Sequence, residues 1–170
     1  EMTSSLVGSE MCIRDRNVRA DKLGGTSDIS AGQLIDRTGK LLGLPFPAGK
    51  AVDALSCESP CKERYRVKLN GLDFSFSGIQ NKTEKFFSET KNAADTAKFV
   101  MNCIVNCIAD ATRAALAQYP GLPVVFSGGV ASNSMLRERM REFAPVFAEP
   151  LFSTDNAMGI AVLAALQEDA

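Results

Sequence analysis

The sequence predicts an α/β fold, built from amphipathic helices and a few short strands. Apolar residues recur at helical spacing over 31–42 and 93–118, which indicates two helices with one buried face each. A short apolar run at 122–126 ends in Gly128-Gly129 before another helix start, the pattern of a buried strand leading into a helix. A chain of 170 residues suits one domain, or one lobe of something larger.

The first sixteen residues, EMTSSLVGSEMCIRDR, fit none of these patterns. They resemble the translated adapter text found at the ends of some metagenomic reading frames, and not a targeting peptide. We therefore interpret 1–16 as a non-native, adapter-derived segment and leave it out of the predicted fold. On this interpretation the native N-terminal part of the protein is missing.

The first predicted helix has a clear start and stop. Ser30 and Gln33 have the spacing of a capping box, and the helical pattern that follows ends at Gly43. Prolines stiffen the loop at 44–49, and a shorter helix is predicted from 50 to about 56.

A β-hairpin is predicted at 65–76. Asn70-Gly71 lies between two alternating segments and favours a two-residue type I′ turn. This register pairs Leu69 with Leu72, Val67 with Phe74 and Tyr65 with Phe76 on one face, and places Lys68 opposite Asp73 on the other. Ser77-Gly78 is expected to form a turn that leads into a helix near 83–88.

The C-terminal half is predicted to begin with the long helix 93–118, which ends before Pro120. The buried strand 122–126 follows, and Ser132 or Asn133 can cap the next helix, 135–141. A short strand at 146–148 and a final helix at 157–166 complete the prediction.

Two segments have more than one interpretation. The Gly128-Gly129 turn can bring backbone close to a phosphate at a helix start, but strand, GG and helix also describe an ordinary tight connection. Asp155 stands at the start of the final helix, where it is either a plain N-cap or a contact for a ligand.

Composition limits the partners. The net charge of −1 gives no global attraction to nucleic acid or anionic membranes, so any RNA contact must be local. Basic residues cluster at 62–68 and 137–141, where interleaved glutamates favour a solvated face. No segment has the composition expected of a membrane span, and with no secretion signal we expect a cytoplasmic protein.

Five cysteines include the pairs Cys57/Cys61 and Cys103/Cys107, each with a spacing of four. The spacing raises the question of a zinc site, but structural zinc usually uses tighter knuckles, and Cys103 and Cys107 fall on the apolar stripe of 93–118. We therefore favour a packing role for these thiols.

Five motifs, in this order, resemble the C-terminal part of the TsaD (Gcp glycoprotease-like) family of tRNA threonylcarbamoyladenosine synthases. The motifs are LGGTSDISAGQLID, LLGLPFPAG, LDFSFSG, SGGVASN and STDNAMGIA, and the resemblance covers about residues 23–166. It implies the two-lobed actin-like ATPase (ribonuclease H-like) fold with a nucleotide between the lobes. Residues 17–170 would be the C-terminal part of that domain.

Matched position by position, the resemblance implies a nucleotide site and one metal ligand. Asp36 corresponds to the acidic residue that binds the ribose hydroxyls, and Gly49 to the loop glycine that approaches the nucleoside. Gly128-Gly129 and Asn133 correspond to the nucleotide-binding turn, and Asp155 to the aspartate ligand of the catalytic metal. Without the resemblance, Asp36 would be interpreted as an exposed helix carboxylate and Gly49 as a loop glycine.

The sequence also departs from the family pattern GET-x-DDA-x-GEAFDK. Gly25 replaces an acid, Ile29 an aspartate and Gln33 a glutamate, whereas Asp28 is retained. The chain has no histidine, although the family's metal site takes two from an N-terminal H-x-x-x-H segment. These departures resemble a divergent paralogue and leave its substrate open.

The resemblance implies transfer of a threonylcarbamoyl group from threonylcarbamoyl-adenylate to the adenosine beside the anticodon in tRNA. It also implies one iron or zinc ion in the full-length protein and partner subunits of a tRNA-modification complex. For the 170-residue chain alone we expect neither a bound metal nor activity. Three alternatives stay open: a divergent actin-like ATPase or kinase, a non-catalytic partner lobe, and a metalloendopeptidase, which the lack of H-E-x-x-H disfavours.

Overall fold

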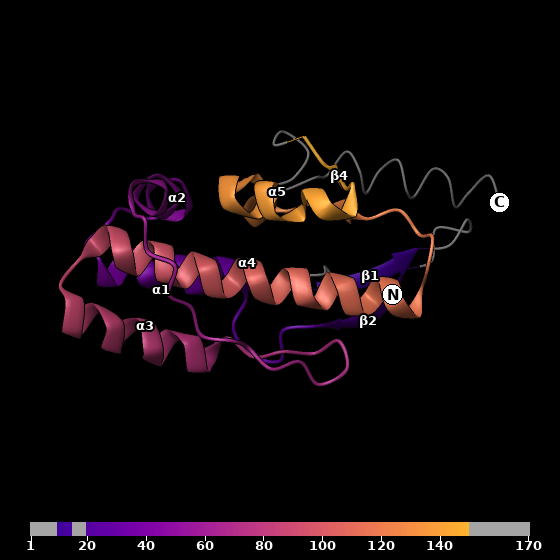
Figure 1. Ribbon diagram of the computed structural model, residues 1–170, viewed down its shortest axis with the longest axis horizontal. Helices are drawn as coiled ribbons and strands as arrows, with labels where there is room; N and C mark the ends of the chain where they lie inside the picture. The colour runs from indigo at the N-terminus through magenta and orange to yellow at the C-terminus, as the bar shows by residue number, and fades with distance from the viewer. Residues whose placement is uncertain (1–9, 15–19, 150–170) are drawn as a thin grey trace, which may run out of the picture.

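Helices make up most of the described part of the protein. The structure is a computed structural model that describes residues 10–14 and 20–149. The long helix α4 (Ala93–Gln118) runs through the length of the molecule, with α2 (Gly49–Glu58) and α5 (Ser134–Met140) on one side and α3 (Ser77–Thr90) on the other (Figure 1). Helix α1 (Ala31–Leu41) also packs against α4, so α4 is the centre of the core.

The predicted start and stop of α1 are confirmed. Gln33 N donates to Ser30 Oγ at 3.1 Å and Ser30 N donates to Gln33 Oε1 at 3.0 Å, which completes the capping box. Gly43, with φ +73°, follows the helix end. The predicted second helix is confirmed as α2, which begins at Gly49, one residue earlier than expected.

The predicted register of the 65–76 hairpin is wrong. Asn70 and Asp73 exchange backbone hydrogen bonds of 2.8 and 3.0 Å, so Gly71 and Leu72 are the central residues of the turn. Gly71 has φ +63°, and a positive φ at the first central position alone indicates a type II′ turn and not type I′. Leu69 therefore does not pair with Leu72, and Asp73 faces Asn70 and not Lys68.

The predicted hairpin is also wrong because its second strand, around Phe74, pairs with residues 25–27 and not with the first strand. Phe74 N donates to Gly25 O at 3.0 Å, and Ser27 N donates to Phe74 O at 2.8 Å. A Cβ on Gly24 would lie 2.6 Å from Leu72 Cβ, so glycine permits this close approach. Phe76 is fully buried while Tyr65 is 45% exposed, so the six paired side chains do not share one face.

Helix α3 begins at Ser77, six residues before the predicted start, and Ser77-Gly78 belongs to its first turn. Its N-cap residue, Phe76, provides no side-chain cap. The Asp28 carboxylate accepts instead, from Phe76 N at 2.9 Å and Ser77 N at 3.0 Å. A cap supplied from a distant segment is invisible in the local sequence, which explains the error.

The predicted long helix is confirmed as α4. Asn92 caps it by accepting from Asp95 N at 3.1 Å, and the predicted stripe, including Phe99, Cys103 and Cys107, is largely buried. By length and hydropathy α4 could span a membrane, contrary to the expectation from the sequence, but 56% of its most apolar stretch is buried, as in a core helix.

Two short strands form after α4. Strand β3 (Val125–Phe126) pairs in parallel with β4 (Val146–Phe147), which confirms a strand at each place. The expected burial of the first strand is wrong, because Val125 is 63% exposed and its partner Val146 60% exposed. Between them lie the 3₁₀ helices η1 (Gly129–Ser132) and η2 (Arg141–Phe143) and helix α5, which Asn133 caps.

The remaining strands lie near the N-terminus. Strand β1 (Glu10–Arg14) pairs antiparallel with β2 (Ala20–Gly25), so part of the segment that we set aside contributes a strand. The non-native origin of 1–16 stays an interpretation. The predicted final helix, 157–166, and Asp155 lie outside the described residues.

Candidate nucleotide site

Asp36 lies on α1 and reaches the start of α2. Its Oδ1 accepts a hydrogen bond from Ala48 N at 2.9 Å. Ala48 is the N-cap residue of α2 and has no capping side chain, so this carboxylate serves as the cap and complements the helix dipole. The contact places Asp36 beside Gly49, the first residue of α2. Its second oxygen, Oδ2, makes no hydrogen bond with the described part of the chain.

A glycine allows α1 to approach the start of α2. A Cβ on Gly39 would lie 2.1 Å from Ala48 Cβ, a distance that two carbon atoms cannot occupy without a shift of the helices. At Gly49, by contrast, a Cβ would meet nothing within 4 Å. Packing therefore requires glycine at position 39, whereas the space beside Gly49 is open.

Asp53, one turn after Gly49 on α2, holds Asn133. Its Oδ1 accepts from Asn133 Nδ2 at 2.8 Å and from Ser134 Oγ at 2.8 Å, and its Oδ2 accepts from Ser134 N at 3.1 Å. Asn133 is only 7% exposed, and its Oδ1 accepts from Leu136 N at 2.9 Å. Both ends of the Asn133 amide are thus engaged, and the start of α5 is tied to α2. Sequence analysis did not single out Asp53, although its position four residues after Gly49 places both on one helix face.

The Gly128-Gly129 turn leads into η1. Gly128 has φ +95° and ψ 162°, a conformation that residues with a Cβ rarely adopt, and a Cβ there would meet nothing within 4 Å. A Cβ on Gly32 of α1 would lie 3.7 Å from Val130 Cγ2. Because Gly32 precedes Asp36 by four residues, the same face of α1 approaches both η1 and α2.

These contacts connect the predicted nucleotide residues through α1 and α2. Asp36 reaches the residue before Gly49, α2 carries Asp53 to Asn133, and α1 packs beside the residue after Gly129. The structure therefore brings these segments into contact, although they are distant in sequence. The roles of Asp36, Gly49, Gly128, Gly129 and Asn133 toward a ligand stay predictions.

Asp28 is a second carboxylate that joins distant segments, although no site role was predicted for it. It accepts from Ile29 N at 2.7 Å, from the two α3 amides described above, and from Ser75 Oγ. Partial burial would raise its pKa, but the hydrogen bonds from Ser75, Ser77 and the Phe76 and Ser77 amides outweigh it and hold the pKa well below its usual value. The charged Asp28 carboxylate therefore connects the segment before α1 to the start of α3.

The described residues do not fit a catalytic metal. In 10–14 and 20–149 no group of three or more His, Cys, Asp or Glu side chains is arranged to hold an ion. The chain has no histidine, and Asp155 lies outside these ranges. Cys103 and Cys107 are buried in α4, and burial raises the pKa of these thiols to about 11 and about 12, which keeps them protonated and poor ligands at neutral pH.

Comparisons with known proteins agree on one family. The family described as TsaD, tRNA N6-adenosine threonylcarbamoyltransferase, matches residues 9–162. A protein of that name from Streptococcus suis (strain 05ZYH33) is 33% identical over 158 residues, which is 86% of this chain and 47% of the relative. A protein of the same name from Pelodictyon phaeoclathratiforme is 35% identical over 174 residues, which is 85% of this chain and 48% of the relative. A protein of the same name from Chloroherpeton thalassium is 30% identical over 186 residues; the match covers 94% of this chain and 52% of the relative. The chain thus spans about half the length of the curated relatives that it matches.

Proposed function

The chain belongs to the TsaD family of tRNA N6-adenosine threonylcarbamoyltransferases, and we propose that it is the C-terminal part of an enzyme with this activity. The observation that carries the proposal is the family match across residues 9–162. The contacts that join Asp36, the start of α2 and Asn133 support it, because they gather the residues expected at a nucleotide. We further propose that this part contributes one wall of a cleft in a two-lobed actin-like fold.

The proposed reaction is acyl transfer. The exocyclic amine of the adenosine beside the anticodon attacks the carbonyl carbon of threonylcarbamoyl-adenylate, the bond to the phosphate oxygen breaks, AMP leaves with the electron pair, and the amine proton passes to solvent. Asp36 Oδ2, which has no hydrogen-bond partner among the described residues, would accept a ribose O–H, while Oδ1 stays on Ala48 N. Backbone N–H groups at the Gly128-Gly129 turn would face the phosphate of the adenylate.

The family implies further components that the described residues do not contain. We propose that one iron or zinc ion is held by residues of the full-length protein, with Asp155 as one ligand, and that it would polarise the carbonyl group. Partner subunits would supply the adenylate and help to present tRNA in the cytoplasm.

The complete gene product provides the test. Asp36→Asn keeps an oxygen for Ala48 N but removes the charge, so it should raise KM for threonylcarbamoyl-adenylate roughly tenfold, as expected for the loss of a charged hydrogen bond. The thermal unfolding temperature should fall by no more than a few degrees, because only the charge at the start of α2 is lost. Glu89→Gln, an exposed carboxylate of α3, is the matched control and should leave KM unchanged. Absence of transfer by the wild-type protein would overturn the function, and an unchanged KM in Asp36→Asn would overturn the role of Asp36.

A further inference from the structure

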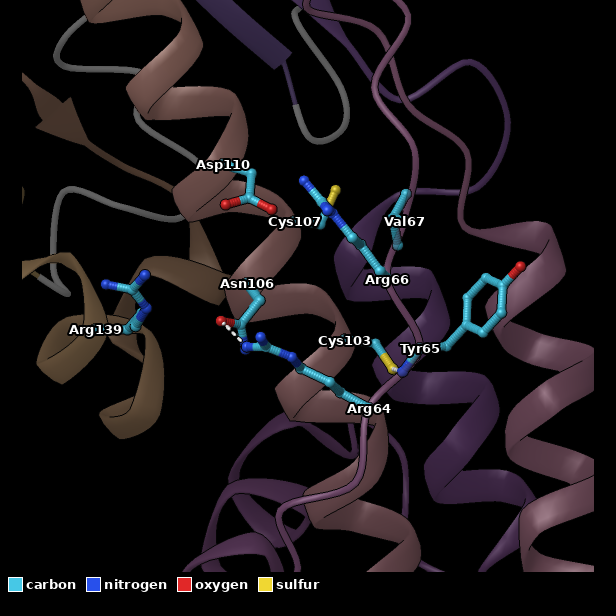
Figure 2. A pocket seen from close by; sticks show the side chains of 9 residues that line it. All are labelled: Arg64, Tyr65, Arg66, Val67, Cys103, Asn106, Cys107, Asp110 and Arg139. Carbon is cyan, nitrogen blue, oxygen red and sulfur yellow. Dashed lines mark hydrogen bonds between the residues drawn. The ribbon is translucent and has the colours of Figure 1, made fainter.

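A cavity outside the candidate nucleotide site gathers arginines from two distant segments. It has a volume of about 250 Å³ and lies between residues 64–67, α4 and α5 (Figure 2). Arg64, Arg66 and Arg139 line it together with one carboxylate, Asp110. Its wall is therefore positive, although the whole chain has a net charge of −1. The basic clusters at 62–68 and 137–141, interpreted from sequence as solvated faces, meet here.

Backbone alternation directs two of these arginines into the cavity. Residues 64–66 are extended beside α4, so Arg64 and Arg66 point toward α4 while Tyr65 points away from it (Figure 2). Tyr65 N donates to Cys103 Sγ at 3.1 Å, and the Lys82 ammonium lies 3.9 Å from the centre of the Tyr65 ring. The segment is thus anchored to α4 on one side and to α3 on the other, which fixes the backbone that carries Arg64 and Arg66.

The guanidinium groups retain donors for a ligand. Arg66 makes no hydrogen bond or ion pair with the described residues, and Arg64 donates to a neutral acceptor, Asn106 Oδ1. Arg139 pairs with Glu142 through one nitrogen, and a guanidinium has five N–H donors. Both nearby acids are already engaged by Arg113, which lies 2.9 Å from Asp110 Oδ1 and 2.8 Å from Glu142 Oε1.

The two cysteines that line the cavity carry no negative charge that would repel an anion. The floor of the cavity is formed by the buried side chains of Cys103 and Cys107. Burial raises the pKa of both thiols, so they are uncharged at neutral pH. An incoming anion therefore meets guanidinium groups on the wall and neutral thiols below.

We propose that this cavity binds a phosphodiester of RNA, with Arg66 as the main contact and Arg64 and Arg139 beside it. Phosphate oxygens accept the paired N–H groups of a guanidinium, which makes arginine a frequent phosphate ligand. A local positive cavity on a chain with little net charge favours a few defined phosphate contacts over general adhesion. The choice of RNA as the phosphate source rests on the proposed function, whereas the anion chemistry rests on the cavity itself.

The test measures the affinity of the 170-residue chain for a fluorescein-labelled tRNA transcript at several KCl concentrations. Arg64→Ala/Arg66→Ala should weaken binding about tenfold or more, the loss expected for charged hydrogen bonds. The slope of log K against log salt should fall by roughly 0.7–0.9, the value for the loss of one phosphate contact. Arg141→Ala is the matched control, because its side chain is 76% exposed, pairs with Glu138 and lies outside the cavity lining. It should change the affinity by less than about twofold, because Arg141 contributes no donor to the cavity and its charge is already paired.

A second pair of variants separates charge from geometry. Arg64→Lys/Arg66→Lys keeps the charge and should keep the salt slope, but it should bind RNA less tightly because lysine cannot form the paired contact. All variants should unfold at the wild-type temperature, because Arg64 and Arg66 are exposed. Equal losses in Arg141→Ala and Arg64→Ala/Arg66→Ala, or no loss in either, would overturn the proposal.

Two further measurements distinguish RNA from other occupants and this proposal from the proposed function. Inorganic phosphate, titrated alone, should bind far more weakly than tRNA; tight, Arg66-dependent phosphate binding without tRNA binding would overturn RNA as the occupant. In the complete gene product, normal threonylcarbamoyl transfer with an unchanged KM for tRNA in Arg64→Ala/Arg66→Ala would overturn the cavity proposal and leave the function standing. Absence of transfer by the wild-type protein, together with tRNA binding that depends on Arg66, would overturn the proposed function and leave the cavity proposal standing.

Discussion

At the scale of single residues, three aspartates hold the starts of helices to which they do not belong. Asp28 accepts from the first amides of α3, Asp36 from Ala48 at the start of α2, and Asp53 from Ser134 at the start of α5. The first amides of a helix have no partner within the helix and carry partial positive charge, so a carboxylate satisfies both needs. These charges therefore fix tertiary structure as well as local structure.

Asp28 should make stability depend on pH in the acid range. Its pKa is lower in the folded state than the ordinary value of 3.8, so its contribution is complete above about pH 4 and is lost as the pH falls through the folded pKa. Asp28→Asn should lower the thermal unfolding temperature by a few degrees at pH 7, and this difference should shrink toward pH 2. Unfolding scans at both pH values test this, and a difference that stays constant with pH would contradict it.

At the scale of elements, the crossing of α1 and α2 sets the position of Asp36. The crossing depends on Gly39, since a methyl group there would overlap Ala48. Strand pairing also depends on a glycine. Gly24 allows Leu72 to approach closely, and Phe74 then pairs with the segment 25–27 and not with the residue predicted across the hairpin. Close backbone approach thus decides both arrangements.

Gly39→Ala should destabilise the chain by about 1–3 kcal/mol through overpacking, even though alanine favours a helix interior by about 1 kcal/mol over glycine. Gly78→Ala, in the first turn of α3 where a Cβ would meet nothing within 4 Å, is the matched control and should be neutral or slightly stabilising. Urea unfolding measures both variants. Equal stability of Gly39→Ala and the wild type would show that α1 and α2 do not approach this closely.

At the scale of the whole molecule, the chain is about half of the relatives that it matches. The candidate nucleotide residues of the described part lie on α1, on α2 and at the starts of η1 and α5. The valines of the β3–β4 pair, Val125 and Val146, are largely exposed, whereas parallel strands are usually covered on both faces. Both features suit a part that functions within a larger protein.

We expect the isolated 170-residue chain to hold no catalytic metal and to carry out no threonylcarbamoyl transfer, and its nucleotide affinity should be weak. Asp155 is the one family metal ligand in the sequence, and a single carboxylate leaves most coordination positions to water. The measurement is modified adenosine after the chain is mixed with metal, threonylcarbamoyl-adenylate and tRNA.

Robust turnover that disappears in Asp155→Ala would contradict this expectation. The control is the complete gene product, in which activity should be present and should be lost in Asp155→Ala, because that carboxylate would then complete the metal site.

The sequence by itself determined the elements whose signals lie within one segment. The capping box of α1, the buried stripe of α4 and the cap of α5 each depend on residues three or four positions apart. The first two were predicted correctly, and the α5 cap is Asn133, one of the two residues predicted for it. The family motifs likewise indicated Asp36 and Asn133 before their contacts were known. These features are local, so a single chain contains the information to predict them.

Only the tertiary structure decided what depends on residues far apart in the chain. Phe74 pairs with 25–27 and not with the residue predicted across the turn, and Asp28 supplies the cap that starts α3. Arg66 and Arg139 line the same cavity. In each case a hydrogen bond or a shared space joins segments that no periodicity or spacing connects. The sum of such contacts outweighs local preference, because turn and cap preferences contribute only about 1 kcal/mol each.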